Sequence, residues 1–349
     1  RPIPSNAKEA VDYYTSQGAK HWLTLDSRMS QAHLALGLLR FGDQVTPNKV
    51  IASLKERSVT DEELGRFWRD TELSFSWYRA PIETQALMIE AFDEISKDAE
   101  AVEDCKVWLI KQKQTQDWKT TKATSDAIYG LLLKGANLLA SDKLVMATLG
   151  GVEVKPQKVE AGTGFYEMRY TPAEIKPAMG EVTLKKEDKG VAWGSLHWQY
   201  LEDMTKITPY STNLKVRKTL FVKEDSAKGP QIRPVAGKLN VGDLLVVRIE
   251  IRTDRDMEYV HLKDGRGSGL EPTDVLSMYR YQDGLGYYQA TKDTGSHFFI
   301  DYLPKGTYVF EYTLRVQHKG KYQTGMAEIQ CMYAPEFNSH SESILLEVQ

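Results

Sequence analysis

The sequence predicts a multidomain α + β protein in which a helical domain is followed by two antiparallel β-sandwich domains. Hydrophobic residues recur with the helical period of 3.6 up to about residue 140, and with the alternating period of strands beyond about residue 142. The 349 residues also exceed what one hydrophobic core usually supports. We therefore assign residues 1–140, 141–224 and 225–349 to three domains.

About seven amphipathic helices are predicted in the first domain, joined by short loops so that neighbours pack antiparallel. Pro47 follows Thr46 at the first position of one helix. Thr60 and Glu63 have the spacing of a capping box and predict the start of the next. Such an array forms half of an α/α toroid or a helical bundle. The predicted helices cover residues 6–17 and 27–42, begin near 47 and 60, and cover 80–96, 101–114 and 120–135.

Two later stretches show strand alternation most clearly. Residues 244–252 and 307–316 each place every second hydrophobic side chain on one face and charged side chains on the other. Turn sequences such as "QDGLG" and "LPKG" separate such runs and favour antiparallel sandwiches. Gly229, Pro230 and Pro234 interrupt the strand pattern, so we place the boundary between the two β domains at residue 224.

Composition excludes several partners. With a net charge of −3, the chain has no cationic excess that would favour nucleic acid or anionic lipid. Proteins or small molecules are the expected partners. No apolar run approaches the roughly 20 residues of a membrane span. Because the chain begins inside a helical array, we expect it to be part of a longer polypeptide whose export signal lies upstream.

The two cysteines predict no chemistry. Cys105 falls in a helical segment and Cys331 in a strand, so a disulfide is not expected, and the histidines lack the spacing of metal ligands. His340 follows Cys331 by nine residues, but the strand position of the cysteine and the predicted loop position of the histidine favour a structural role for both. The glycine-rich "GRGSG" at 265–269 predicts a flexible hairpin tip instead of a phosphate loop. No cofactor or metal is predicted.

Five segments carry a family resemblance, in the same order along the chain. The sequence resembles the C-terminal part of bacterial alpha-2-macroglobulins, specifically the long forms of Bacteroidetes-like bacteria, and the resemblance covers essentially the whole chain. The segments are "APIETQALMIEAF", "WLIKQKQTQDWKTTKATSDAIYGLLL", "AWGSLHWQYLEDMTKI", "DYLPKGTYVFEYTLRVQHKG" and "GMAEIQCMYAPEFNSHSES".

The resemblance implies a partial α/α toroid of the thioester-domain type at 1–140, a CUB-like β domain at 141–224 and a terminal macroglobulin domain, the counterpart of a receptor-binding domain, at 225–349. It further implies a non-enzymatic endopeptidase inhibitor, periplasmic or lipid-anchored, whose partners are proteases. Family members sequester a protease that has cut their bait region. This chain departs from the full pattern because it has no bait region and no Cys-x-Glu-Gln thioester sequence.

Met332 and Tyr333 are the site residues that the resemblance selects. Family members that keep the thioester use a Met-Tyr pair at this place to cover it and to exclude water. Residues 332–336, "MYAPE", match that pattern residue by residue. Since no thioester sequence is present here, the pair either keeps the shielding role or only docks the terminal sandwich against the helical domain, and we favour docking.

Two other classes of function fit the architecture. A polysaccharide lyase also combines a toroid with β-sandwiches, but it requires Asn, His, Tyr and Arg side chains converging in the toroid cleft. The helical half contains only His21 and His33, with no adjacent Asn/Tyr set. The other class is a protein-binding module of the cell envelope, with penicillin-binding proteins as candidate partners.

Overall fold

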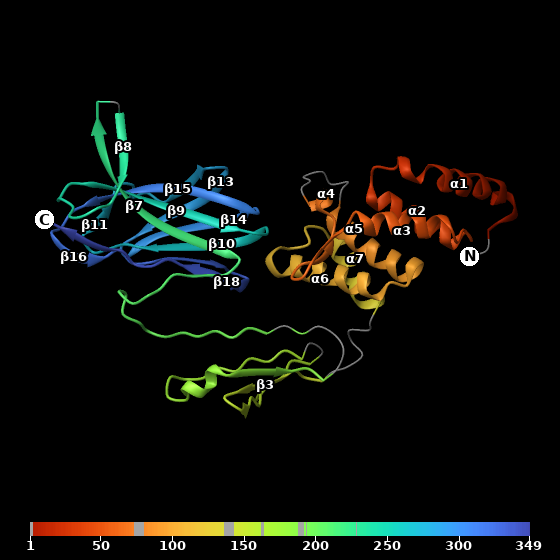
Figure 1. The fold of residues 1–349 in the computed structure, drawn as a ribbon, viewed down its shortest axis with the longest axis horizontal. Helices are drawn as coiled ribbons and strands as arrows, with labels where there is room; N and C mark the ends of the chain where they lie inside the picture. The colour runs from red at the N-terminus through yellow and green to blue at the C-terminus, as the bar shows by residue number, and fades with distance from the viewer. Residues whose placement is uncertain are drawn as a thin grey trace. The chain divides into compact units, whose positions relative to one another are not determined.

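A computed structural model describes residues 3–72, 80–135, 143–161, 164–187, 192, 194–227 and 229–349. The chain divides into two compact units (Figure 1). The first unit comprises residues 1–112 and 118–194, and the second comprises 113–117 and 195–349. Helices followed by several antiparallel sheets confirm the predicted α + β class. The predicted boundary at 140/141 lies outside the described residues.

The helical domain contains the predicted amphipathic helices except the one expected to begin at Thr60, and a π-helical turn at Phe92–Ser96. Helix α2 packs against α3 and α5, and α5 packs against α7. Thr120 caps α7 by accepting a hydrogen bond from the Ala123 N–H at 3.0 Å. The helices are α1 (Lys8–His21), α2 (Arg28–Arg40), α3 (Thr46–Glu56), α4 (Arg69–Glu72), α5 (Pro81–Ala91), α6 (Ala99–Thr115) and α7 (Thr121–Leu133). Among them, none combines the length and apolar character needed to cross a bilayer.

One predicted helix start is wrong. Thr60 lies in a β-hairpin made of β1 (Val59–Asp61) and β2 (Gly65–Phe67). The Asp61 carboxylate accepts hydrogen bonds from the N–H groups of Glu63 at 2.9 Å and Leu64 at 2.8 Å. These bonds close the turn of the hairpin in place of a helical turn. Gly65 adopts φ +74°, a conformation that ends any helix beginning here. The capping-box spacing was therefore coincidental.

Aromatic side chains fill the core of the helical domain. Trp68 is 1% exposed and its indole N–H donates to the Leu54 carbonyl at 2.9 Å. Its ring stacks on Phe92 with centroids 6.3 Å apart. Cys105 is fully buried in α6, as the sequence predicts, and its carbonyl accepts a hydrogen bond from the buried Gln85 amide at 3.1 Å. These polar contacts satisfy the groups that burial removes from water.

The small β domain of the first unit contains one antiparallel sheet in its described residues. Its strands are β3 (Met146–Leu149), β4 (Val152–Glu153) and β5 (Val182–Lys185), in the order β4-β3-β5.

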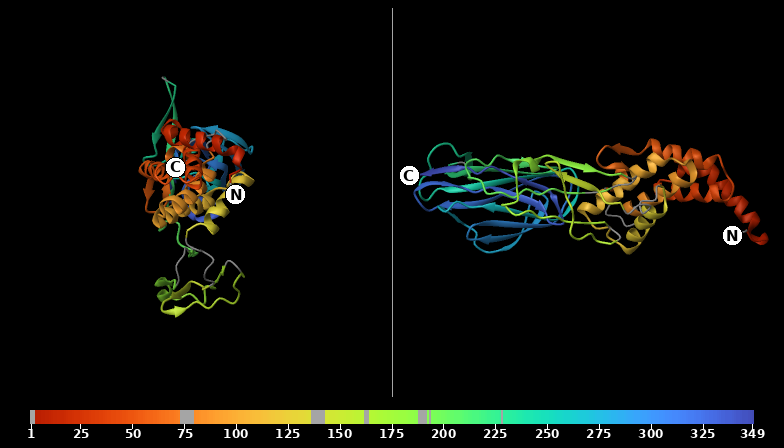
Figure 2. Two further views of the ribbon diagram at one scale, coloured as in Figure 1. Left: turned by 90° about the vertical axis from the view of Figure 1, so that its right-hand side faces the viewer. Right: turned by 90° about the horizontal axis from the view of Figure 1, so that it is seen from below.

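The second unit is a β-sandwich of two large sheets and one short strand pair (Figure 1, Figure 2). The seven-stranded sheet has the order β12-β13-β14-β10-β17-β18-β6, the five-stranded sheet the order β11-β15-β9-β7-β8, and β16 pairs with β19. The strands are β6 (Tyr210–Ser211), β7 (Leu214–Ser226), β8 (Gly229–Pro234), β9 (Leu244–Thr253), β10 (Met257–Gly265), β11 (Leu270–Pro272), β12 (Met278–Gln282), β13 (Leu285–Lys292), β14 (Gly295–Leu303), β15 (Gly306–Val316), β16 (Gly320–Gln323), β17 (Ala327–Cys331), β18 (Ala334–His340) and β19 (Leu345–Val348).

The sandwich core follows the predicted alternation. In β9, the fully buried residues Leu245, Val247 and Ile249 alternate with side chains on the opposite face. Phe298 of β14 and Phe310 of β15 meet across the two sheets with ring centroids 5.0 Å apart. Alternate residues of the central strands thus contribute apolar area to one shared core.

The sequence-based boundary at residue 224 is displaced. Residues 214–224 belong to β7, which pairs with β9 along ten residues from Leu214 to Lys223. Gly229 and Pro230 lie in the hairpin between β7 and β8, whose ends project from the sandwich as a two-stranded ribbon (Figure 1, Figure 2). The glycine and prolines therefore mark a hairpin and an edge strand, not a domain boundary.

The segment "GRGSG" also differs from its prediction. Gly267 and Gly269 are buried, and a Cβ atom on Gly269 would lie 2.4 Å from the Tyr322 ring. The glycines therefore permit close packing of this segment against Tyr322 of β16, and the segment is not a free hairpin tip.

One ion pair lies between the two sheets. Lys218 of β7 is 7% exposed and Asp264 of β10 is fully buried, with Nζ and Oδ1 2.6 Å apart. The ammonium also donates to the carbonyls of Gly265 at 3.1 Å and Gly325 at 3.2 Å. Tyr312 of β15 donates its hydroxyl proton to the other carboxylate oxygen. The charges are thus satisfied without water.

Candidate functional site

Met332 and Tyr333 form the two-residue turn of the hairpin between β17 and β18. Cys331 pairs with Ala334 across this turn, and the register shifts between Gln330 and Cys331. The strand β18 therefore begins immediately after Tyr333 and continues to His340, so the loop predicted for "APEFNSHSES", residues 334–343, is wrong for residues 334–340. The strand β18 pairs with β17, and His340 pairs with Tyr210 of β6. The sequence of β18 shows no clear alternation that would predict a strand.

The cysteine and histidine of this segment do not meet. Cys331 is fully buried, and its thiol donates to the Glu258 carbonyl at 3.4 Å. Burial raises the pKa of the Cys331 thiol, so the group stays protonated and is a poor nucleophile. His340 lies at the other end of β18, opposite Glu328, and its ring packs against Tyr210 at 6.0 Å between centroids. The predicted strand position and structural role of Cys331 agree with this placement.

The hairpin tip exposes two large side chains. The exposed fraction is 54% for Met332 and 79% for Tyr333. The Met332 N–H donates to the Tyr259 carbonyl at 2.9 Å, and the rings of Tyr259 and Tyr333 meet edge to face with centroids 5.4 Å apart. Which surface these side chains cover in the whole protein stays a prediction.

Tyr259 is a residue that the sequence analysis missed. It has φ +55° within β10, a conformation that is unusual for a bulky side chain. The pairing of β10 with β14 skips it, because Glu258 is opposite Tyr302 and Val260 is opposite Ile300. The register of the two strands is unchanged on either side of Tyr259, so this is a local backbone distortion, and it brings the Tyr259 ring against the Tyr333 ring. Its signal in the sequence is the spacing of three residues between the inward-facing Met257 and Val260, where an unbroken strand has two.

Residues 113–117 belong to the same unit and lie at this end of the sandwich. The Thr115 hydroxyl donates to the Asp256 carbonyl at 2.9 Å, and the Asp117 N–H donates to the Glu258 carboxylate at 3.1 Å. The Gln114 amide donates to the Glu336 carboxylate, three residues beyond the hairpin tip. These contacts link a distant part of the sequence to the strand end that presents Tyr259.

A match to a protein family covers this sandwich. Residues 214–336 match the sequence model of the bacterial alpha-2-macroglobulin MG10 domain. The match begins at the first residue of β7 and ends just after the hairpin tip, so it includes Met332 and Tyr333. It confirms the family resemblance for these residues.

Individual proteins are similar at low sequence identity. A Dictyostelium discoideum protein called circularly permutated Ras protein 2 is 24% identical over 215 residues, which are 61% of this chain and 5% of that protein. A point mutant of Salmonella alpha-2-macroglobulin is 15% identical, with 96% of this chain and 21% of that chain covered and a TM-score of 0.34. Trypsin-activated alpha-2-macroglobulin from Escherichia coli is 14% identical, with 95% and 22% covered and a TM-score of 0.40. The chain thus spans a small part of each of these proteins.

Proposed function

We propose, on the premise that residues 214–336 match the MG10 domain of bacterial alpha-2-macroglobulins, that this chain is part of a macroglobulin-type endopeptidase inhibitor. In this proposal the chain is not an enzyme, and its partners are proteases that the whole inhibitor sequesters. The observation that carries the proposal is the family match over the terminal sandwich, including the hairpin tip.

The hairpin tip serves in this proposal to dock the terminal sandwich against the helical domain. An apolar thioether and an aromatic ring, both more than half exposed on a two-residue turn, are suited to bury against a second protein surface. Shielding of a thioester is the alternative role. The sequence favours docking because neither Cys105 nor Cys331 is followed by the x-Glu-Gln residues that form a thioester.

Protease sequestration is tested with the whole polypeptide that contains this chain. After incubation with trypsin, a trapped protease keeps its activity on a small chromogenic peptide and loses activity on a large protein substrate. Tyr333→Ala is expected to weaken this protection, whereas Tyr279→Ala, a similarly exposed tyrosine on β12, is the matched control. Equal cleavage of both substrates by the protease would contradict the proposed function.

The proposed location is the periplasm or the cell envelope, through a lipid anchor in the longer polypeptide. Fractionation of the source cells tests it, because a cytoplasmic pool of the protein would contradict this location. Envelope proteins such as penicillin-binding proteins are proposed as additional partners, and pull-down with the solubilised membrane proteins tests them.

A further inference from the structure

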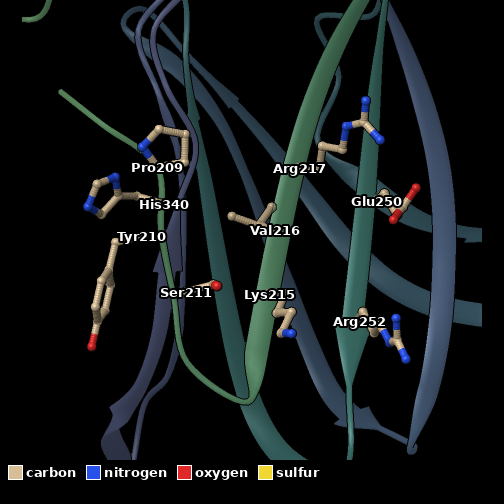
Figure 3. Close-up of a pocket in the computed structure, with 9 residues that line it drawn as sticks. All are labelled: Pro209, Tyr210, Ser211, Lys215, Val216, Arg217, Glu250, Arg252 and His340. Atoms are coloured by element: carbon tan, nitrogen blue, oxygen red, sulfur yellow. The ribbon is translucent and has the colours of Figure 1, made fainter. Parts of the chain in front are cut away.

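The terminal sandwich has a hollow at the end of β18 that is opposite to the hairpin tip. Its cavity volume is about 280 Å³. Figure 3 shows Pro209, Tyr210, Ser211 and His340 on one side of β7, and it shows Glu250 and Arg252 of β9 on the other side. The lining residues are Pro209, Tyr210, Ser211, Lys215, Val216, Arg217, Glu250, Arg252 and His340.

Cations dominate this hollow. Lys215 of β7 is directly opposite Arg252 of β9, and Arg217 is opposite Glu250. Like charges placed opposite each other on neighbouring strands are destabilising. Three cations and one carboxylate leave two positive charges in excess among the lining groups that are charged at neutral pH.

Two other arginines of the same sheet are paired with carboxylates. Arg248 and Glu311 approach to 2.6 Å, and Arg233 and Glu224 approach to 2.6 Å. By contrast, Lys215, Arg217 and Arg252 form no hydrogen bond or ion pair with any residue that the structure describes. All three are exposed, so their donors are available to a ligand.

We propose that this hollow binds a phosphate-bearing group. A phosphate monoester carries close to two negative charges at neutral pH, which matches the excess of two positive charges. An arginine guanidinium group can donate two parallel hydrogen bonds to the oxygens of one phosphate, and a lysine ammonium group adds a compact positive charge. The Ser211 hydroxyl is a further donor that lines the hollow, and the rings of Tyr210 and His340 line its part on the other side of β7 (Figure 3). A single carboxylate would leave one cation unneutralised.

The phosphate has two possible sources, a free phosphorylated sugar and a phospholipid headgroup. Titration of the full chain with glucose 1-phosphate at low ionic strength tests the first source by calorimetry. Cosedimentation with phosphatidylcholine vesicles, with and without phosphatidic acid, tests the second. Saturable binding in either arm supports the proposal and identifies the source.

Two double variants decide whether the hollow is the site. Lys215→Gln with Arg252→Gln is expected to weaken binding at least about tenfold, because two charge-assisted contacts are lost. Lys223→Gln with Arg315→Gln removes the same charge from exposed positions of the same sheet outside the hollow, and is expected to change binding by less than about twofold. Absence of binding in both arms, or equal losses in the two double variants, would overturn the proposal. The inhibitor function can fail without affecting this result.

Discussion

Replacing Lys218 by methionine tests how the ion pair between the two sheets stabilises the terminal sandwich. The variant removes the ammonium group and leaves the Asp264 carboxylate buried, with the Tyr312 hydroxyl as its remaining donor. It also leaves the carbonyls of Gly265 and Gly325 without the donor that they share. Breaking a buried pair by removing one partner costs about 3–5 kcal/mol, and we expect a loss of this size.

The loss should depend on pH in a defined direction. Burial raises the pKa of Asp264, while Lys218 acts against this effect. Without Lys218 the folded-state pKa is raised further above the ordinary value of 3.8, so the protonated carboxyl group is favoured in the folded variant. A raised folded-state pKa contributes stability that is lost as pH rises. The deficit of Lys218→Met is therefore expected to grow from acidic to neutral pH.

The assay is urea unfolding of the full chain. Hydrogen exchange of peptides from β10 and β15 monitors the unfolding of the terminal sandwich. Tryptophan fluorescence is a weak probe of the sandwich core, because Trp198 is the last tryptophan of the sequence, precedes the strands of the second unit and is 50% exposed. Lys215→Met, an exposed position on the same strand, is the control, with an expected change below about 0.5 kcal/mol. If Lys218→Met does not fold, Tyr312→Phe provides a milder test, with an expected loss of about 1–3 kcal/mol. A change within about 1 kcal/mol for Lys218→Met would refute the reasoning.

Three further outcomes are expected. Burial lowers the pKa of both His261 and His297 below 6.5, so stability is fully present above pH 6.5 and falls as the pH decreases; His261→Asn should reduce this dependence in urea unfolding. Tyr333→Ala is expected to lower the free energy of unfolding of the isolated chain by less than about 1 kcal/mol, because the side chain is 79% exposed. A larger loss in urea unfolding would show that Tyr333 stabilises the fold of the isolated chain. Incubation with methylamine is expected to leave the intact mass unchanged, since the sequence lacks Cys-x-Glu-Gln, and an adduct would contradict this.

Periodic patterns predicted the elements that bury a regular face. The alternation in β9 and β15 identifies the strands and their inward residues, and the helical spacing of 80–96, 101–114 and 120–135 corresponds to α5, α6 and α7. These predictions succeed because burial on one face imposes its period on the sequence.

Elements determined by long-range contacts were missed. β18 pairs with β17 and β6, and its side chains do not alternate strongly enough to distinguish a strand from a loop. Residues 214–224 were placed in the wrong domain because the partner that fixes them, β9, lies twenty and more residues further along the chain. The hairpin at 59–67 is a different case, because its sequence has a local signal for a helix start at Thr60. The turn formed by the Asp61 carboxylate and the positive φ of Gly65 favour the hairpin instead.

The left-handed backbone at Tyr259 and the hairpin tip contact each other. A bulky residue in the left-handed region costs about 1–3 kcal/mol and persists only where its surroundings fix it. The Met332 N–H holds the Tyr259 carbonyl at 2.9 Å, and the Tyr333 ring packs on the Tyr259 ring. Movement of the tip would therefore release the constraint that holds Tyr259. Glu258, the preceding residue, accepts hydrogen bonds from the Cys331 thiol and the Asp117 N–H, so a continuous series of contacts connects the tip with the segment 113–117.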